Sequence, residues 1–430
     1  MRERSIRPTE WEKYLLGSVL FLSVLIGGGT ASGLYTEMLI EIAAIVSAAI
    51  VLSRPLGQRV PRSVLWLLAL VLAVFCFQIV PLLPAALLSG LRPEVLLASP
   101  WLAGETRLRF VSVGVGRTIE CFLYFSAAAA FFLSVVRLRP DQVYGLLPFF
   151  FMGVICNGLA AAIQYSLSDT VAIKGLLPFT VNAGLFANQN HFSALLFVSI
   201  PFAVYYGLFR GNLLSGSLGL ITLLLLLLAT GSRAGILIGL AITIVSVVFL
   251  SARSRLGGYG ILAVFIGLSL YTMGAWTKID AEVVDPTFGR AEFARTTIAG
   301  IEENWTTGVG FGSFQKVYQI YEKGEMIFKP YVNHAHNDYL ELTLEGGAPV
   351  VLLIVVYLTL LFASSVGIRR YPLQKAAFLS VSFLLVHSLV DYPLRTAALA
   401  MIFAYMNGII FHKGFAERLN PKRRADRGPS

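Results

Sequence analysis

The chain has 430 residues, of which 56% are hydrophobic and only 13% are charged, whereas an ordinary globular domain carries about 25% charged residues. This composition excludes a soluble globular enzyme, and the sequence lacks the alternating pattern of a transmembrane barrel. Residues 219–232 and 347–367 contain no charge at all. Such runs predict transmembrane helices, because a bilayer core about 30 Å thick needs about 20 helical residues.

Apolar runs predict an all-α polytopic membrane protein with about twelve transmembrane helices. The predicted spans are residues 14–30, 37–53, 63–88, 117–136, 142–165, 190–208, 214–230, 233–251, 258–275, 348–366, 375–391 and 396–412. Four parts follow along the chain: helices 1 to 9 in residues 1–275, a long loop domain with short helices in 276–347, helices 10 to 12 in 348–412, and a basic tail in 413–430. Loops as long as the second part usually have a function.

The basic residues are concentrated in alternate loops. If the N-terminus is cytoplasmic, the inner segments hold 21 of the 34 Lys and Arg residues but only 6 of the 24 Asp and Glu residues. These inner segments are residues 1–13, 54–62, 137–141, 209–213, 252–257, 367–374 with Lys375 at the edge, and 413–430. The positive-inside rule therefore predicts that both termini are cytoplasmic. It also places residues 276–347 outside, in the periplasm of a Gram-negative cell.

Three polar side chains stand at the outer start of the sixth predicted span, in GLFANQNHFSALL (184–196). Two roles fit Asn188, Asn190 and His191. They are candidates for binding sugar hydroxyls, and amides at this position also cap helices. Capping is the expected role for one of them.

An arginine stands at the outer turn between the seventh and eighth predicted spans, in LATGSRAGILIGL (228–240). A charged residue at membrane depth is costly and indicates a function, unless its side chain reaches the interface. Arg233 lies outside, against the inward bias of the basic residues, and this position favours a functional role.

Within the long loop, residues 288–314 predict a short amphipathic helix followed by the glycine-rich turn GVGFG. Its expected apolar side consists of Phe293, Ile298 and Ile301. Arg290 and Arg295 are candidates for binding phosphate, because guanidinium groups pair well with phosphate oxygens. Surface solvation is the alternative for each arginine. No strand precedes the glycines, so they are not a dinucleotide fingerprint.

The most polar part of the loop is YVNHAHNDYLELTLEGG (331–347). It predicts a short helix over about 338–345, with Asp338 as its N-terminal cap and Glu341 at the matching position of a capping box. Gly346 and Gly347 are the expected stop.

His336 and Asn337 come just before this helix, where free N–H groups and the helix dipole favour anions. A neutral imidazole here suits a general base, although these side chains could instead only hold the loop together. The alternate spacing of His334, His336 and Asp338 also fits a metal site. Because Asp338 is expected to cap the helix and no third ligand is evident, we expect no metal and no other cofactor.

The external face thus combines arginines, histidines and amides beside the membrane. Arginines that hold a diphosphate, together with a histidine that takes a proton from an attacking hydroxyl, indicate a lipid diphosphate donor. The sequence shows no pair of acidic residues on this face of the kind that hydrolytic glycosidases use.

Four segments resemble the bacterial O-antigen ligase and polymerase superfamily, and they occur in the order of that family. They are GLFANQNHFSA, TGSRAG, GRAEFARTTIAGIEENWTTGVGFGSF and HAHNDYLELTLEGG. The resemblance covers about residues 180–400. Two positions depart from the family pattern: Ala294 stands in place of a tryptophan, and Trp305-Thr306-Thr307 stand in place of the proline before Gly-x-Gly.

The resemblance implies a helical bundle of the lipid-dependent glycosyltransferase kind in a bacterial inner membrane, with its active site on the periplasmic face. The implied reaction transfers a glycan from undecaprenyl diphosphate to an acceptor hydroxyl without a metal or a nucleotide. By this resemblance His336 is the base or the group that activates the acceptor, and Arg233 and Arg290 hold the diphosphate. We add Asn337 as an orienting residue and His334 as a helper, and the choice between His334 and His336 as the base stays open. The implied partners are the lipid-linked donor, a glycan or lipid A–core acceptor, and membrane lipids, with no nucleic acid.

Three acceptor classes stay open: a growing glycan, lipid A–core, and protein. The form of FANQNH favours a polymerase slightly. The competing class is a transporter or flippase for a lipid-linked sugar, which needs ionisable groups along a path through the bilayer. Glu41 and Glu120, in or near predicted spans, are candidates for such a path.

Overall fold

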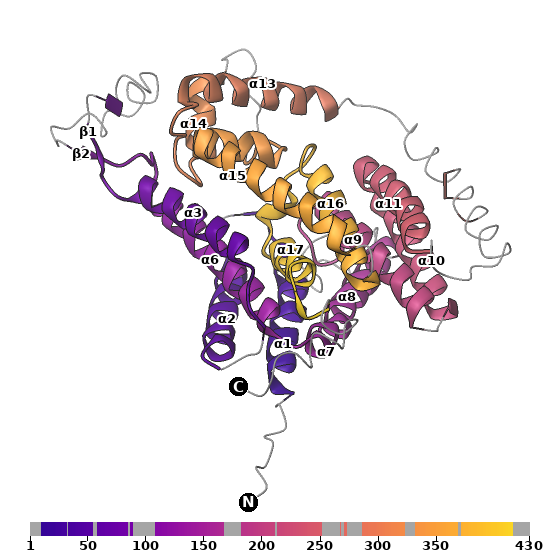
Figure 1. Cartoon of the computed structure of the whole chain (residues 1–430). Helices are drawn as coiled ribbons and strands as arrows, with labels where there is room; N and C mark the ends of the chain where they lie inside the picture. The colour runs from indigo at the N-terminus through magenta and orange to yellow at the C-terminus, as the bar shows by residue number, and fades with distance from the viewer. Residues whose placement is uncertain are drawn as a thin grey trace, which may run out of the picture.

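The computed structural model describes residues 10–31, 33–54, 58–84, 87–88, 108–166, 182–210, 213–251, 267, 271–272, 286–322, 332–368 and 371–415. Helices dominate these residues (Figure 1). The helices are α1 (Trp11–Ile26), α2 (Tyr35–Leu52), α3 (Arg62–Ile79), α6 (Val115–Arg137), α7 (Pro140–Tyr144), α8 (Leu147–Ser166), α9 (Gln189–Phe209), α10 (Leu213–Thr230), α11 (Arg233–Ser251), α13 (Pro286–Asn304), α14 (Phe314–Tyr321), α15 (Asp338–Ile368), α16 (Pro372–His387), the 3₁₀ turn η4 (Pro393–Arg395) and α17 (Ala397–Ile410). Two short strands, β1 (Leu83–Pro84) and β2 (Leu108–Arg109), pair antiparallel.

The protein is an all-α polytopic membrane protein, as predicted. Among the described residues, eight helical stretches are long and apolar enough to cross a membrane, and α17 is a shorter apolar helix. Eleven of the twelve predicted spans coincide with described helices. The ninth predicted span, 258–275, falls almost wholly outside the described residues, as do parts of the long loop and most of the basic tail.

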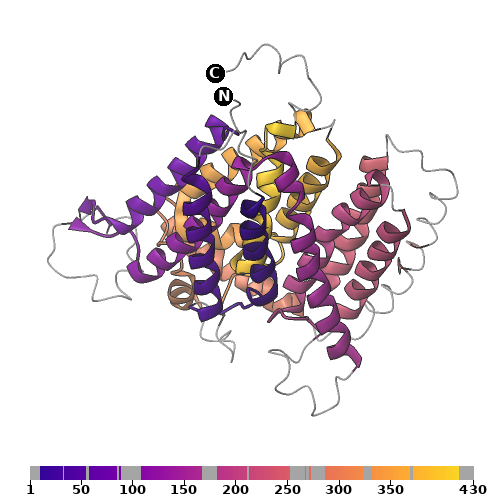
Figure 2. The same cartoon turned by 90° about the horizontal axis from the view of Figure 1, so that it is seen from below.

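The helices form a bundle with two distinct ends. Helix α9 packs against α10, α11 and α16, whereas α6 packs against α2, α3 and α17. Seen from below, α10 and α11 lie on one side of the bundle and α3 on the other (Figure 2). Helices α13 and α14 lie across the upper end, and α7 lies at the lower end (Figure 1).

Contacts at the lower end join loops that the charge pattern assigns to one side. The guanidinium of Arg54 lies over the ring of Trp11, 5.1 Å from its centroid. His412 Nε2 lies 2.7 Å from the carbonyl oxygen of Leu138. Trp11 and Arg54 thus bring two predicted inner segments together, and His412, at the end of the last predicted span, lies beside a third.

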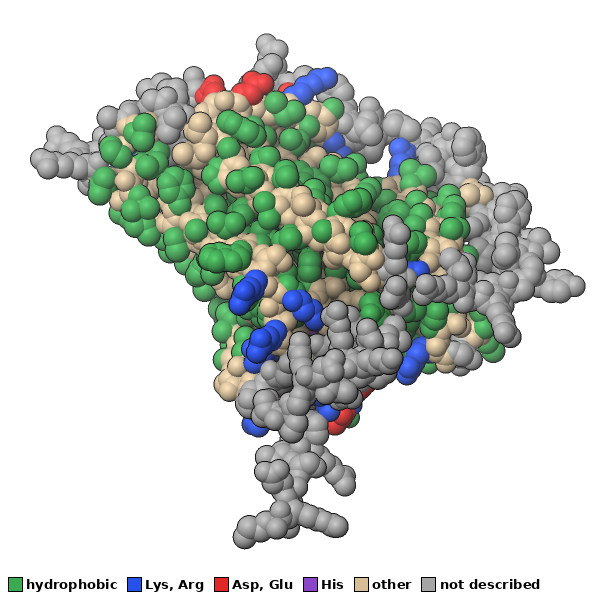
Figure 3. Space-filling view, viewed as in Figure 1, with side chains coloured by type: hydrophobic (Ala, Val, Ile, Leu, Met, Phe, Trp, Pro, Cys, Tyr) green, Lys and Arg blue, Asp and Glu red, His purple; other side chains and the backbone are tan. Residues whose placement is uncertain are grey.

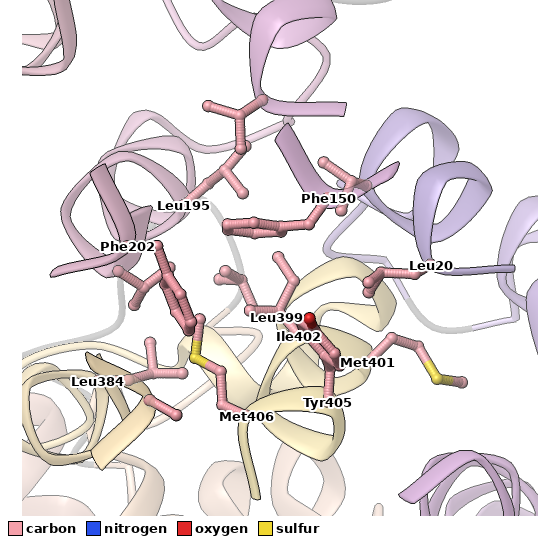
Figure 4. Close-up of a cluster of buried hydrophobic side chains, with 14 of the residues drawn as sticks. Leu20, Phe150, Leu195, Phe202, Leu384, Leu399, Met401, Ile402, Tyr405 and Met406 are labelled. Atoms are coloured by element: carbon pink, nitrogen blue, oxygen red, sulfur yellow. The ribbon is translucent and has the colours of Figure 1, made fainter. Parts of the chain in front are cut away.

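The core between the two ends is apolar and closely packed. Leu20, Phe150, Phe202, Leu384 and Ile402 bring side chains from α1, α8, α9, α16 and α17 into one cluster (Figure 4). The face of the molecule seen in Figure 3 is also largely hydrophobic between the two ends. A hydrophobic exterior is what a helix bundle needs in contact with lipid.

Helix α3 is shorter than the predicted span 63–88. It ends at Ile79, and Val80 is already extended. Pro81 and Pro84 follow, and proline cannot continue a helix because it lacks an N–H. The buried side chain of Gln78 donates to Glu345 O and accepts from Phe311 N. These bonds attach the end of α3 to α15 and to the turn before α14.

The predicted amphipathic helix of the loop is α13, and its apolar side was partly wrong. Phe293 and Ile301 pack against a small core with Phe314 and Leu344. Ile298 is exposed instead. It lies five residues after Phe293, which is about 140° around a helix of 3.6 residues per turn.

The predicted short helix and the tenth span are joined as α15, with a break at the expected glycine pair. Gly347 has φ 61° and ψ −157°, which is not a helical conformation. The segment before Gly347 packs with α13 and α14 at the upper end, and the apolar segment after Gly347 crosses the bundle. A side chain at Gly347 would meet the backbone of residues 305–308.

The turn GVGFG requires its glycines. Gly308, Gly310 and Gly312 all have positive φ, where glycine alone avoids strain. A Cβ on Gly310 would lie 2.6 Å from Ser112 Cα.

Gly310→Ala is therefore expected to destabilise the protein by about 2–4 kcal/mol, from backbone strain plus overpacking. Gly33→Ala is the control, because Gly33 also has positive φ but open space around it, and it should cost only about 1–2 kcal/mol. Unfolding of the detergent-solubilised variants measures both. Equal losses would show that packing against Ser112 adds nothing.

Candidate functional site

The loop before α15 is fixed by Asn337. Its Oδ1 accepts hydrogen bonds from the N–H groups of Tyr339 and Leu340, at 3.0 and 3.1 Å, so Asn337 caps the helix. Its Nδ2 donates to Leu389 O at 2.8 Å. The prediction that Asp338 is the cap was wrong. Asp338 is buried and accepts a hydrogen bond from Ser388 Oγ.

His336 has a left-handed backbone, with φ 51°, and is the one non-glycine residue with positive φ in the described ranges. Such a conformation is costly for a side chain with a Cβ and occurs most often at functional sites. The ring stacks on Phe293 with centroids 5.7 Å apart. The side chain stays 21% exposed, which leaves it accessible at the surface of the protein.

Asp391 faces His336 from the turn after α16. Its Oδ1 lies 3.4 Å from His336 Nδ1, and its side chain is only 1% exposed. A carboxylate at Nδ1 favours the tautomer with a proton there, so that Nε2 becomes the basic nitrogen. Burial opposes ionisation of Asp391. The contact with His336 and the charge of nearby histidines outweigh burial and hold the pKa of Asp391 well below its usual range.

The ring of Tyr392 lies among three histidines. Its centroid is 4.2 Å from that of His334, 4.9 Å from that of His336 and 4.7 Å from that of His191. His191, predicted as a substrate contact, is fully buried, with Nε2 3.9 Å from Asp391 Oδ1. The structure therefore places His191 beneath the loop histidines.

His334 is held by Glu341. Its Nδ1 lies 2.8 Å from Glu341 Oε1. Burial disfavours the protonated ring, but the adjacent carboxylate outweighs burial and raises the pKa of His334 above its ordinary value. His334 and His336 thus have different carboxylate partners, Glu341 and Asp391.

The predicted amides at α9 connect helix ends. Asn188 Oδ1 accepts from Asn190 N at 2.8 Å and caps α9, which is the capping role expected for one of the two. Asn190 Oδ1 accepts from Ser232 Oγ at 2.8 Å. Ser232 Oγ in turn accepts from Gly235 N and caps α11. These bonds hold Arg233, the first residue of α11, next to the start of α9.

The two loop arginines of α13 face different ways. Arg290 is half-buried, and its positive charge interacts electrostatically with His387 at the end of α16. Arg295 is 74% exposed and lies 3.6 Å from Glu292. Five residues separate them, about 140° around the helix, so both cannot face the same site. Arg290 therefore lies on the side of the histidines and Arg295 on the outer side.

Three carboxylates also gather here, around Arg395. Arg395 Nη2 lies 2.9 Å from Glu345 Oε2 and 3.4 Å from Glu341 Oε1, and its Nε lies 3.9 Å from Asp338 Oδ1. All three carboxylates are buried and paired with donors. They are not arranged as a free acid and base about a glycosidic bond.

Residues 218–355 match a protein-family model described as O-Antigen ligase. Over this segment the chain is similar to the O-antigen ligase family. The comparison with curated proteins gives no match. The matched segment includes the two loop histidines together with Arg233, Arg290 and Arg295. It does not include α9 or the turn after α16.

Sequence analysis missed the turn 391–395, DYPLR, which supplies Asp391, Tyr392 and Arg395 to this candidate site. A signal was present. Arg395 is a basic residue between the last two predicted spans, outside the inner segments, the same anomaly that singled out Arg233. Among the described residues, no group of His, Cys, Asp and Glu has the arrangement of a metal site.

Proposed function

We propose that this chain is a glycosyltransferase that transfers a glycan from undecaprenyl diphosphate to an acceptor hydroxyl at the periplasmic face of a bacterial inner membrane. The observation that carries the proposal is His336, strained and accessible, with Asp391 at its Nδ1. The similarity of residues 218–355 to the O-antigen ligase family supports a reaction of the ligase or polymerase type. The charge pattern of the loops supports cytoplasmic termini.

His336 Nε2 takes the proton of the acceptor hydroxyl as its oxygen forms a bond to the anomeric carbon. The bond between that carbon and the diphosphate oxygen breaks, and its electron pair stays on the leaving undecaprenyl diphosphate. Arg290 and Arg233 stabilise the growing negative charge. Asp391 stabilises the imidazolium that forms. Asn337 holds the loop in register, and no metal ion or nucleotide takes part in the proposed reaction.

The distribution of buried ionisable groups favours this enzyme over a transporter. In the described part of the chain, these groups lie at the two ends of the bundle, such as Glu12 and Lys375 at one end and Asp391 and Glu345 at the other. The core between them is apolar. Glu120 pairs with Arg117 at 2.7 Å at the start of α6, and both are exposed.

The test is transfer by purified protein from a synthetic undecaprenyl-diphosphate glycan, with EDTA present. Separate reactions offer a second lipid-linked repeat, lipid A–core, and an acceptor protein. Product with the first acceptor identifies a polymerase, with the second a ligase, and with the third a protein O-oligosaccharyltransferase. Movement of donor between liposome leaflets with no product from any acceptor would overturn the enzyme in favour of a flippase.

A further inference from the structure

The side chain of Arg395 is mostly buried, with 18% exposed, and the proposed reaction does not use it. It belongs to η4, between α16 and α17, and its guanidinium reaches both Glu341 and Glu345 on α15. These residues are one helical turn apart, so one arginine spans both carboxylates. A buried charge is retained only where it is paired, and each carboxylate here has a further set of partners.

Glu341 uses both oxygens to hold the histidine loop. Oε1 contacts His334 Nδ1 at 2.8 Å as well as Arg395. Oε2 accepts from the N–H of Ala335 at 2.9 Å. The backbone of Ala335 is therefore fixed directly before the strained residue His336.

Glu345 likewise uses both carboxylate oxygens, and it holds the glycine-rich turn. Its Oε1 accepts from Gly312 N at 2.8 Å and from Phe314 N at 3.4 Å. Its Oε2 takes the hydrogen bond from Arg395 at 2.9 Å. This turn leads into α14, which packs with α13 and its Phe293, the ring that stacks on His336.

The strain at His336 needs support from both sides. After it, Asp338 N donates to Ser388 O at 2.9 Å, and Asn337 is bonded to Leu389 O. Before it, the support comes from Glu341, whose carboxylate is itself held by Arg395. A left-handed residue with a Cβ persists only where its surroundings determine it in this way.

We propose that Arg395 is a positioning residue for His336: by clamping Glu341 and Glu345 together, it fixes the histidine loop and the glycine-rich turn in one arrangement. This role rests on the proposed function of His336. The claim that Arg395 couples two segments is separate from that function and has its own readout.

Glu341→Gln tests the support of the histidine loop, and Glu345→Gln tests the support of the glycine-rich turn. Both tests are possible because each carboxylate oxygen accepts from a donor. Whichever way the new amide turns, its NH₂ group meets an N–H donor, either Arg395 or the backbone. Glu341→Gln is expected to speed amide hydrogen exchange in residues 332–337 by about tenfold and to lower kcat by about 10–100-fold, with the donor KM changed less than about threefold. Glu345→Gln should speed exchange in residues 310–314.

Arg395→Lys tests the coupling, because a lysine cannot bond both carboxylates in the same fork geometry. It should speed exchange in both segments at once. The matched control is Glu12→Gln, a buried carboxyl that accepts from Gln142 Nε2 at the opposite end, which should leave both segments unchanged.

Unchanged exchange in both segments of Arg395→Lys, or an unchanged kcat in Glu341→Gln, would overturn the positioning role. A wild-type protein without transfer activity would instead overturn the proposed function. In that case, exchange in the Arg395→Lys variant still decides whether the clamp exists.

Discussion

His336→Gln is expected to lower kcat for glycan transfer by about 10²–10⁴-fold, the usual contribution of a general base. Glutamine keeps a polar side chain but cannot accept a proton at neutral pH. Asp391→Asn is expected to lower kcat strongly as well, because an amide at Nδ1 no longer fixes the tautomer or stabilises the imidazolium. Initial rates with a synthetic lipid-linked donor measure both.

His412→Gln is the matched control for this prediction. His412 is a buried histidine, bonded to Leu138 O, and it lies at the other end of the bundle. Its replacement should leave kcat within about twofold, since it makes no contact with the proposed site. If His336→Gln keeps half of the wild-type rate, the base lies elsewhere.

Asp391 also predicts a dependence of stability on pH. The pKa of Asp391 is lowered in the folded state, so its contribution is present above the unfolded pKa of about 3.9 and is lost as pH falls through the folded value. In Asp391→Asn the acid side of the stability curve should be flatter than in the wild type below about pH 4. Identical acid limbs would contradict this assignment.

Arg290→Ala is expected to lower kcat/KM for the donor by about 10²–10³-fold, the scale of losing one donor that stabilises developing charge. Arg290→Lys should recover only part of this loss, because an ammonium lacks the planar fork that matches a diphosphate. Rates over a range of donor concentrations separate a loss in kcat from a loss in binding.

Arg295→Ala provides the comparison on the same helix. Arg295 is exposed and lies beside Glu292, so its replacement should change kcat/KM far less than that of Arg290. This differs from the expectation, drawn from the sequence, that both arginines bind phosphate. Equal losses in the two variants would mean that α13 presents both arginines to the donor.

Hydropathy alone predicted the class of fold. In a bilayer the backbone N–H and C=O groups must bond to each other, so only helices and closed barrels can span it. The break in α15 was also predictable from the sequence, because its backbone has a positive φ and a glycine, Gly347, stands there. Helix caps were harder to place. Asn337 and Asp338 are adjacent residues of similar cap preference, and the choice between them depends on Ser388 and Leu389, about 50 residues away.

The site was predictable only in part, because it too depends on contacts between residues far apart in the sequence. The two loop histidines and Arg233 stand in local patterns that a sequence displays. The side chains that hold them do not, because Asp391 and Arg395 follow the histidines by more than 50 residues and meet them only through the packing of α15 against α16 and α17. No local pattern carries such a pairing.

The boundaries of the matched segment, 218–355, have a practical consequence for chimeric proteins. A transplant of this segment alone would move the two loop histidines and their arginines into a new host. It would leave behind Asp391, Tyr392 and Arg395, as well as the α9 side chains that lie beneath them. Exchange of acceptor or donor preference between such proteins therefore requires grafts that extend from the start of α9 to the end of η4.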